Sequence, residues 1–253
     1  MFKELRIEVN KACNLACDHC YTEKKGPPGV EVEQFKSIIR EAARQGATDL
    51  SLTGGEPLID KPRTYAMIQA GVEAGLKVRL NTNGILITEA VSAELRNSGI
   101  TEVQISLNSA EEEDFDVFVH RKGAFRKVKE AIQNLKKEGI ETTIRYTLMQ
   151  RNMHQLVPTY ELITQWGVET FKVRCLVQTN HIKEDGWDEA AGSLRSVVMD
   201  LIVAARHGQT KVYIADDGLK AIESREGKCD KLVCKCGRDA IFISSDGNIS
   251  PCP

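Results

Sequence analysis

Three cysteines stand close together near the start of the chain and could bind a metal centre. Residues 13–20 read CNLACDHC, which places Cys13, Cys17 and Cys20 in the spacing C-x3-C-x2-C. A closed structural zinc site takes four protein ligands, and so does a complete iron–sulfur cluster. Three cysteines therefore leave one metal position open for another ligand.

Two other interpretations of these cysteines are open at this point. The three thiolates could hold a zinc ion with His19 as the fourth ligand, or they could be ordinary loop cysteines. The chain has eight cysteines. In a reducing compartment, cysteines are more often metal ligands or thiols than disulfides.

The composition is that of an ordinary soluble globular protein. The chain has 253 residues, of which 42% are apolar and 28% charged, and its net charge is −2. This charge balance gives no sign of a nucleic-acid or membrane-surface partner. We find no run of about 18 apolar residues and no signal peptide, so we expect a cytoplasmic protein without a membrane span.

Short apolar strands alternate with longer amphipathic helices along most of the chain. The expected strands are 5–9, 49–53, 77–81, 102–107, 141–148 and 170–177. The helices expected after them are 32–46, 63–75, 88–99, with Thr88 as its cap, 125–139, 155–167 and 190–208. Six such units predict an α/β fold, a partial (β/α)6 TIM-like barrel of parallel strands. Chemistry is then expected at the carboxyl ends of the strands, where the cysteines lie.

The pattern changes after residue 210. A further strand is expected at 211–214, and strands 240–244 and 248–251 flank Asp246-Gly247, a β-hairpin turn signal. This region is rich in cysteine, with Cys229, Cys234, Cys236 and Cys252. We therefore divide the chain into a core, 1–210, and a short cysteine-rich extension with a C-terminal hairpin, 211–253.

The cysteine motif resembles the signature of the radical S-adenosylmethionine (SAM) enzymes. In both, C-x3-C-x2-C follows a first strand, with an aromatic residue, here His19, before the third cysteine. The resemblance implies that Cys13, Cys17 and Cys20 hold a [4Fe–4S] cluster. It also implies that the amino and carboxylate groups of SAM chelate the fourth iron, which would fill the open position.

The stretch TGGEP, at the end of the second expected strand, strengthens this resemblance. The family carries GGEP here, which implies that Gly54, Gly55, Glu56 and Pro57 surround the amino group of SAM. Glycines let a backbone approach a ligand closely, and Glu56 supplies a carboxylate for an ammonium. On its own, the stretch would favour a glycine turn that caps the next helix, but beside the three cysteines it favours the family role.

Further residues match the family position by position. Asn83, in NTNG, is implied to lie near the methionine end of SAM, and Ser106, in SLNS, to bind its ribose or carboxylate. Related members often have Asp-Gly where this chain has Asn108-Ser109. Arg121 matches an arginine that pairs with the SAM carboxylate, a role that suits bidentate geometry, although it could be a surface arginine. At the end of the sixth strand, Arg174 could contact SAM or substrate.

The C-terminal cysteines resemble the opening of the SPASM or twitch extension of this family. Cys236 and Cys252 flank Gly247 with the spacing of that extension, which implies a second, auxiliary [4Fe–4S] cluster. The family pattern continues with further cysteines, so we expect the extension in this sequence to be incomplete, and Cys229 and Cys234 could substitute. A zinc knuckle is the alternative.

The resemblance implies a reaction. A one-electron reductant of the flavodoxin or ferredoxin type would reduce the cluster, SAM would be cleaved to a 5′-deoxyadenosyl radical, and this radical would take a hydrogen atom from the substrate. We favour oxidative modification or crosslinking in peptide or protein maturation, with oxidation of a small molecule or tetrapyrrole as the alternative. A non-catalytic iron–sulfur or zinc protein is the rival from another class; it would explain the cysteines but not GGEP at a strand end.

Overall fold

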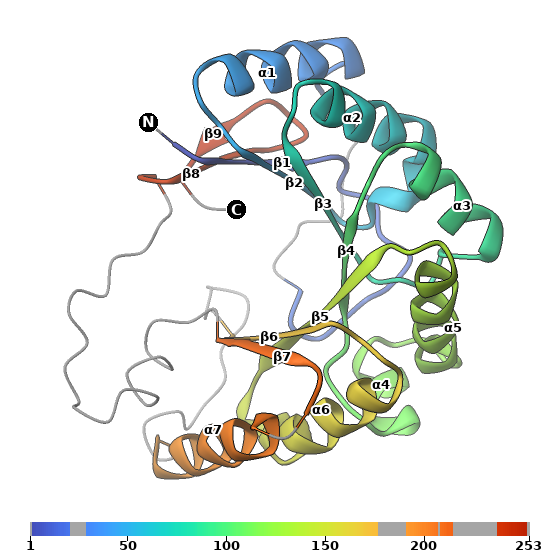
Figure 1. The fold of residues 1–253 in the computed structure, drawn as a ribbon, viewed down its shortest axis with the longest axis vertical. Coiled ribbons are helices and arrows are strands. Elements are labelled where there is room, and N and C mark those ends of the chain that lie inside the picture. Colours follow the sequence, from blue (N-terminus) through green and yellow to red (C-terminus); the bar gives the residue numbers. More distant parts are fainter. Residues whose placement is uncertain (1, 21–28, 177–190, 207, 215–236, 252–253) are drawn as a thin grey trace.

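A single nine-stranded sheet organises the part of the chain that the computed structural model describes, residues 2–20, 29–176, 191–206, 208–214 and 237–251. Its strands, in chain order, are β1 (Glu4–Glu8), β2 (Asp49–Thr53), β3 (Lys77–Thr82), β4 (Glu102–Ser106), β5 (Glu141–Leu148), β6 (Thr170–Cys175), β7 (Lys211–Ile214), β8 (Ala240–Ile243) and β9 (Ile249–Ser250). The order across the sheet is β7-β6-β5-β4-β3-β2-β1-β8-β9. Only the β8–β9 pair is antiparallel. The strands form an open arc (Figure 1), which confirms the expected partial barrel with a C-terminal hairpin.

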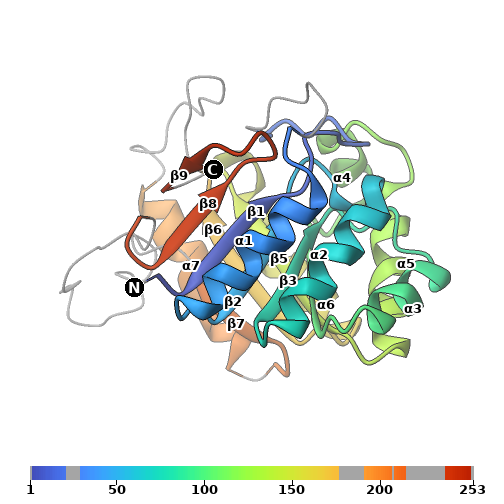
Figure 2. The ribbon, with the colours of Figure 1, turned by 90° about the horizontal axis from the view of Figure 1, so that it is seen from above.

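The helices all lie on the outer side of this arc (Figures 1 and 2). They are α1 (Val32–Arg44), α2 (Lys61–Glu73), α3 (Glu89–Asn97), α4 (Glu112–Phe118), α5 (Ala124–Lys137), α6 (Leu156–Gln165) and α7 (Ala191–Ala205), with short 3-10 helices η1 (Pro57–Asp60) and η2 (Gln150–Gln155). The expected cap of α3 is present, since the Thr88 hydroxyl accepts from the Val91 N–H at 3.3 Å. The sequence analysis missed α4, a short acidic helix that buries only Phe115 and Phe118.

The two faces of the sheet differ in chemistry. Side chains alternate between the faces of a strand. On the outer face, residues such as Leu5, Leu52 and Ile105 are fully buried in the hydrophobic core beneath the helices. The inner face is polar: Glu4 pairs with Arg6 at 2.8 Å and with Arg79 of β3 at 3.2 Å. The core therefore lies between sheet and helices, and the inside of the arc presents charged groups.

The hairpin joins this sheet beside the first strand. β8 pairs in parallel with β1, a partnership that the sequence analysis did not predict (Figure 2). At the turn, the Glu8 carboxylate accepts from the Ser245 N–H at 3.0 Å and from its hydroxyl at 2.9 Å, and Ser245 is fully buried. Lys11, two residues before Cys13, pairs with Asp246. Strands from both sides of residue 210 thus share one sheet, and the division into two domains stays a prediction.

In the described part of the chain, no helix has the length and apolar character needed to cross a bilayer.

Replacing Glu8 should loosen the hairpin. Glu8→Ala leaves the buried N–H and hydroxyl of Ser245 without an acceptor, so we expect the free energy of unfolding to fall by about 2–4 kcal/mol. Ser245→Ala removes one of the two hydrogen bonds and should cost about 1 kcal/mol. Urea unfolding measures both, and Glu161→Ala on the exposed face of α6 is the matched control, expected within about 0.5 kcal/mol of wild type. An unchanged midpoint and slope for Glu8→Ala would contradict this account of the hairpin.

Candidate functional site

The three cysteines lie on a loop, residues 9–20, that leaves the carboxyl end of β1; we call it the cysteine loop. Backbone hydrogen bonds fix its first half against the turn after β2. The Val9 N–H donates to the Thr53 carbonyl at 2.7 Å, the Gly55 N–H to the Asn10 carbonyl at 2.9 Å and the Glu56 N–H to the Ala12 carbonyl at 2.6 Å. The first cysteine thus follows a segment whose backbone is held at three points.

The two glycines of this turn are required by the cysteine loop itself. A Cβ atom on Gly54 would lie 2.5 Å from the Asn10 carbonyl oxygen, and one on Gly55 would lie 2.2 Å from that of Ala12. Real side chains do not tolerate such distances, and the obstructing atoms are backbone. From the sequence we expected these glycines to admit a ligand; the structure shows that they first admit the loop that carries the cysteines.

Glu56 joins the turn after β2 to the turn after β3. Its side chain has no exposed surface, and Oε1 accepts from the Leu58 N–H at 3.0 Å and the Thr82 hydroxyl at 2.8 Å, while Oε2 accepts from the Asn83 N–H at 2.7 Å. Burial raises the pKa of Glu56, although these three donors oppose the shift. Oε2 has a single donor, so it is the oxygen with remaining capacity for an ammonium group. The next residue, Pro57, begins η1 and is buried.

Asn83 reaches the middle of the cysteine loop. Its Nδ2 donates to Asn14 Oδ1 at 2.7 Å. Asn14 stands between Cys13 and Cys17, and its own Nδ2 is buried without a partner in the described part of the structure. A buried donor without an acceptor is costly, so this amide is available to donate to a group bound beside the cysteine loop.

The link between α4 and α5 holds the other side of the loop. The Ala16 N–H donates to the Val119 carbonyl at 3.3 Å and the Asp18 N–H to the Phe118 carbonyl at 3.2 Å. Arg121, expected to pair with the SAM carboxylate, is exposed here and donates to the Asn14 carbonyl at 3.2 Å.

Asp18 and His19 pack against this link through their side chains. The Asp18 carboxylate is bound by His120 and by Arg151 at 2.8 Å; burial alone would raise its pKa, but these two partners lower it. The His19 ring stacks on Phe118 with 4.9 Å between centroids, and the Arg151 guanidinium lies 4.5 Å above the Phe118 ring. Burial, together with the charges of Arg151 and Arg145, lowers the pKa of His19 to about 4, so the ring is neutral at pH 7.

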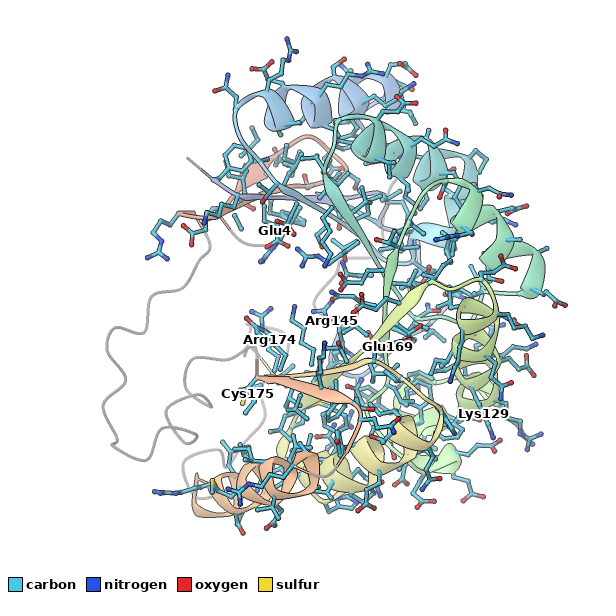
Figure 3. All side chains as sticks on the ribbon, in the orientation of Figure 1. Glu4, Lys129, Arg145, Glu169, Arg174 and Cys175 are labelled. Atoms are coloured by element: carbon cyan, nitrogen blue, oxygen red, sulfur yellow. The ribbon has the colours of Figure 1, made fainter. Side chains whose placement is uncertain are left out.

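The remaining expected residues lie on the inner face of the sheet. Ser106, at the end of β4, is half-buried and in register with Arg145 of β5, which donates to Asn81 at 2.9 Å. Arg174 is exposed on β6 and points into the arc, and Cys175 beside it packs partly against the core (Figure 3). Asn108 accepts from the Thr147 N–H at 2.7 Å, so its role here is to hold the end of β5.

Sequence reasoning missed two inner-face cations, Arg145 and Lys172. Both are strand residues, which we had treated only as framework. The alternation of polar and apolar residues in these strands could have indicated them. When helices cover the outside of a barrel, the polar residues of such a strand must lie inside.

The cysteine loop fits an iron–sulfur cluster. Cys13, Cys17 and Cys20 are half-buried and outside any disulfide. Within the described ranges, no three His, Cys, Asp or Glu side chains converge closely enough for a single metal ion. Thiolates are the usual ligands of iron–sulfur clusters, so the chemistry of these three side chains fits such a cluster. Cys229, Cys234, Cys236 and Cys252 lie outside the described residues.

Comparisons with known proteins agree with this geometry. The family model of the radical SAM superfamily matches residues 7–163. The AdoMet-dependent heme synthase of Methanosarcina barkeri is 34% identical over 175 residues, 68% of this chain and 50% of that protein. The mycofactocin maturase MftC of Mycolicibacterium smegmatis is 28% identical over 256 residues, 98% of this chain and 64% of that protein.

A solved structure shares the fold over nearly the whole chain. Streptococcus suis SuiB bound to its precursor peptide SuiA superposes with a TM-score of 0.80 at 19% identity, covering 99% of this chain and 60% of SuiB. SuiB has also been solved with S-adenosylmethionine. The chain therefore spans between one half and two thirds of the length of these relatives.

The glycine turn gives a direct test of how the loop is built. In Gly55→Ala, the new Cβ would overlap the Ala12 carbonyl, so we expect the loop to be displaced and the iron bound after anaerobic reconstitution to fall to less than about half of wild type. Gly29→Ala is the control, because its Cβ would meet the nearest atom at an ordinary 3.4 Å. Iron analysis with circular dichroism of each variant makes the comparison. A folded Gly55→Ala protein with its full iron would show that this contact does not shape the loop.

Proposed function

We propose, since this chain belongs to the radical SAM superfamily, that it cleaves S-adenosylmethionine reductively and modifies a peptide substrate by oxidation or crosslinking. One observation carries the proposal. Backbone hydrogen bonds and close contacts hold the cysteine loop against the Gly54–Gly55 turn, at the carboxyl edge of a parallel sheet. That edge is where barrel enzymes place their chemistry.

In this proposal, Cys13, Cys17 and Cys20 hold a [4Fe–4S] cluster through their thiolates, and SAM completes its coordination. When bound, the cluster and SAM supply a 5′-deoxyadenosyl radical that removes a hydrogen atom from the substrate. The buried Asn14 Nδ2, which has no hydrogen-bond partner among the described residues, supports the assignment of the cluster to this loop, because it can donate to a sulfur of the bound group. An external one-electron reductant of the flavodoxin or ferredoxin type would be needed.

The chain's own residues would bind and orient SAM from three neighbouring turns. Glu56, through Oε2, and the Gly54–Gly55 backbone would receive the ammonium group. Asn83 is placed to face the same end of SAM, since it contacts both Glu56 and Asn14. Ser106 and the neutral ring of His19 would line the rest of the cofactor.

Two remaining family assignments stay proposals. Arg121 would have to leave the Asn14 carbonyl, or share it, to pair with the SAM carboxylate. An auxiliary cluster held by Cys229, Cys234, Cys236 and Cys252 would accept the electron left on the substrate and make the net reaction an oxidation.

A peptide substrate is favoured by how far the similarity extends. The match to the maturase runs over 98% of this chain, and the peptide-bound SuiB structure covers 99% of it. Oxidation of a tetrapyrrole is the second candidate. It is favoured by the higher identity, 34%, to the heme synthase, although that match covers 68% of this chain.

The proposal predicts which cysteines are needed for SAM cleavage. Cys17→Ala removes one cluster ligand, so dithionite-dependent formation of 5′-deoxyadenosine should fall at least about a hundredfold. Cys175→Ala is the matched control, because Cys175 lies on β6 and outside the three-cysteine motif, and it should retain wild-type formation. Chromatography of anaerobic reactions measures both products of SAM cleavage. Equal product in Cys17→Ala and wild type would refute the assignment.

A further inference from the structure

Three basic residues lie together on the inner face of the sheet, Arg145 and Lys172 in the middle of their strands and Arg174 near the end of β6. In the register of the sheet, Ser106 of β4 is paired with Arg145 of β5. Arg145 is in turn paired with Lys172 of β6, and Lys172 with Tyr213 of β7. Arg174 follows Lys172 by two residues and so faces the same side. Figure 3 shows Arg145 and Arg174 pointing into the arc from the same part of the sheet. We call Arg145, Lys172 and Arg174 the basic cluster.

Of these three residues, Lys172 has a positive charge that its surroundings disfavour. It is half-buried, and its Nζ lies 5.5 Å from the centre of the Tyr213 ring, a cation–π contact. In the described part of the chain neither Lys172 nor Arg174 makes an ion pair with a carboxylate. Burial and the charges of Arg145 and Arg79 lower the pKa of Lys172 to about 8.

The acidic residues nearest to the cluster have other partners. Glu4 is bound by Arg6 at 2.8 Å and by Arg79 at 3.2 Å. Glu102 pairs with Lys77 at 3.3 Å and accepts from Gln104 at 2.8 Å. The charges of Glu4 and Glu102 favour the protonated form of Lys172, but less than burial and the arginines disfavour it. Among the described residues, Lys172 and Arg174 are thus inner-face cations whose charge is not matched by a carboxylate at ion-pair distance.

We propose that the basic cluster binds a carboxylate of the substrate. This inference rests on the proposed function, in which the substrate lies against the inner face of the sheet. Neighbouring strands are about 4.8 Å apart, so one carboxylate can bridge Arg145 and Lys172. Arg174, about 7 Å farther along the strand, is in reach of a second acceptor. Guanidinium groups bind carboxylates in a bidentate manner, and a cation without a partner gains most from such a ligand.

Both candidate substrate classes can supply this group. A peptide carries it on Asp, Glu or its C-terminus, and a tetrapyrrole carries it on propionate side chains. The experiment therefore uses both as probes: coproporphyrin III beside its tetramethyl ester, and a fluorescein-labelled peptide with alternating Glu beside the same peptide with Gln. Binding is measured anaerobically to the reconstituted full chain in the presence of SAM, by absorbance and by fluorescence anisotropy.

Three variants separate the charge at this position from the rest of the site. Lys172→Met should weaken binding of the acid form of at least one probe by about tenfold or more, because an ion pair is lost. Lys172→Arg should stay within about threefold of wild type. Lys211→Met is the matched control, because it removes the same charge from the amino end of β7, where Lys211 faces Thr170. The tetramethyl ester and the Gln peptide should bind wild type and all three variants with the same affinity.

The pH dependence gives a second readout. An anion needs the protonated amine, so acid-probe affinity should be complete below about pH 8 and fall at higher pH. A bound carboxylate raises the pKa of Lys172, which moves the fall upward from 8. Lys172→Arg should abolish the fall, since its guanidinium stays charged. Tyr213, which also faces Lys172, is tested with Tyr213→Phe, and this variant should keep the wild-type profile.

The outcomes are distinguishable. Loss of binding for the porphyrin acid alone, or for the Glu peptide alone, supports the inference and identifies the source of the carboxylate. Equal binding of acid and neutral probes, or unchanged binding in Lys172→Met, overturns it. A matching loss of SAM affinity in Lys172→Met would assign the cluster to the cofactor and also overturn it. Absence of 5′-deoxyadenosine formation in wild type would instead count against the proposed function, while the binding data still report on the cluster.

Discussion

The close contact between two backbone segments is the constraint on which the candidate site depends. The cysteine loop can leave β1 in its observed path only because Gly54 and Gly55 have no side chains, and the resulting hydrogen bonds tie the loop to the turn after β2. The carboxylate of Glu56 then extends this connection to the turn after β3. The positions of the three cysteines and of the proposed SAM contacts are therefore set by one arrangement of three neighbouring strand ends, as accurate positioning of reactive groups requires.

The contrast between the two faces of the sheet explains how a stable fold carries such a polar interior. The hydrophobic effect acts on the outer face, where helices cover the apolar strand residues, so the inner face is not needed for the core. Its charged residues are stabilised by pairing, as in the Glu4–Arg79 bridge. Around Lys172, in the middle of β6, the described residues provide no ion pair, and we propose that a ligand supplies the opposite charge there. The outer face of the strands thus provides the hydrophobic stability of the fold, and the inner face of the same strands provides the polar groups for binding.

Much of this organisation could be predicted from the sequence. Glycine-terminated helices between short strands indicated the partial barrel, and the spacing of Cys13, Cys17 and Cys20 indicated the radical SAM superfamily, which the family model confirms. The pairing of β8 with β1 could not be predicted, because a four-residue apolar strand does not encode a partner more than 200 residues away. The second function of the glycine pair was missed for the same reason, since its neighbours Asn10 and Ala12 are distant in sequence. Local patterns specify elements, whereas close approach between elements is a tertiary property.

The central claim is that the cysteine loop holds an iron–sulfur cluster. The most direct measurement is iron and acid-labile sulfide per chain after anaerobic purification, in wild type and in a Cys13/Cys17/Cys20 triple alanine variant. The account predicts that the variant loses about four irons and four sulfides, with any remainder belonging to the cysteines of the extension. Equal iron in the two proteins, or stoichiometric zinc in wild type that disappears in the variant, would contradict it.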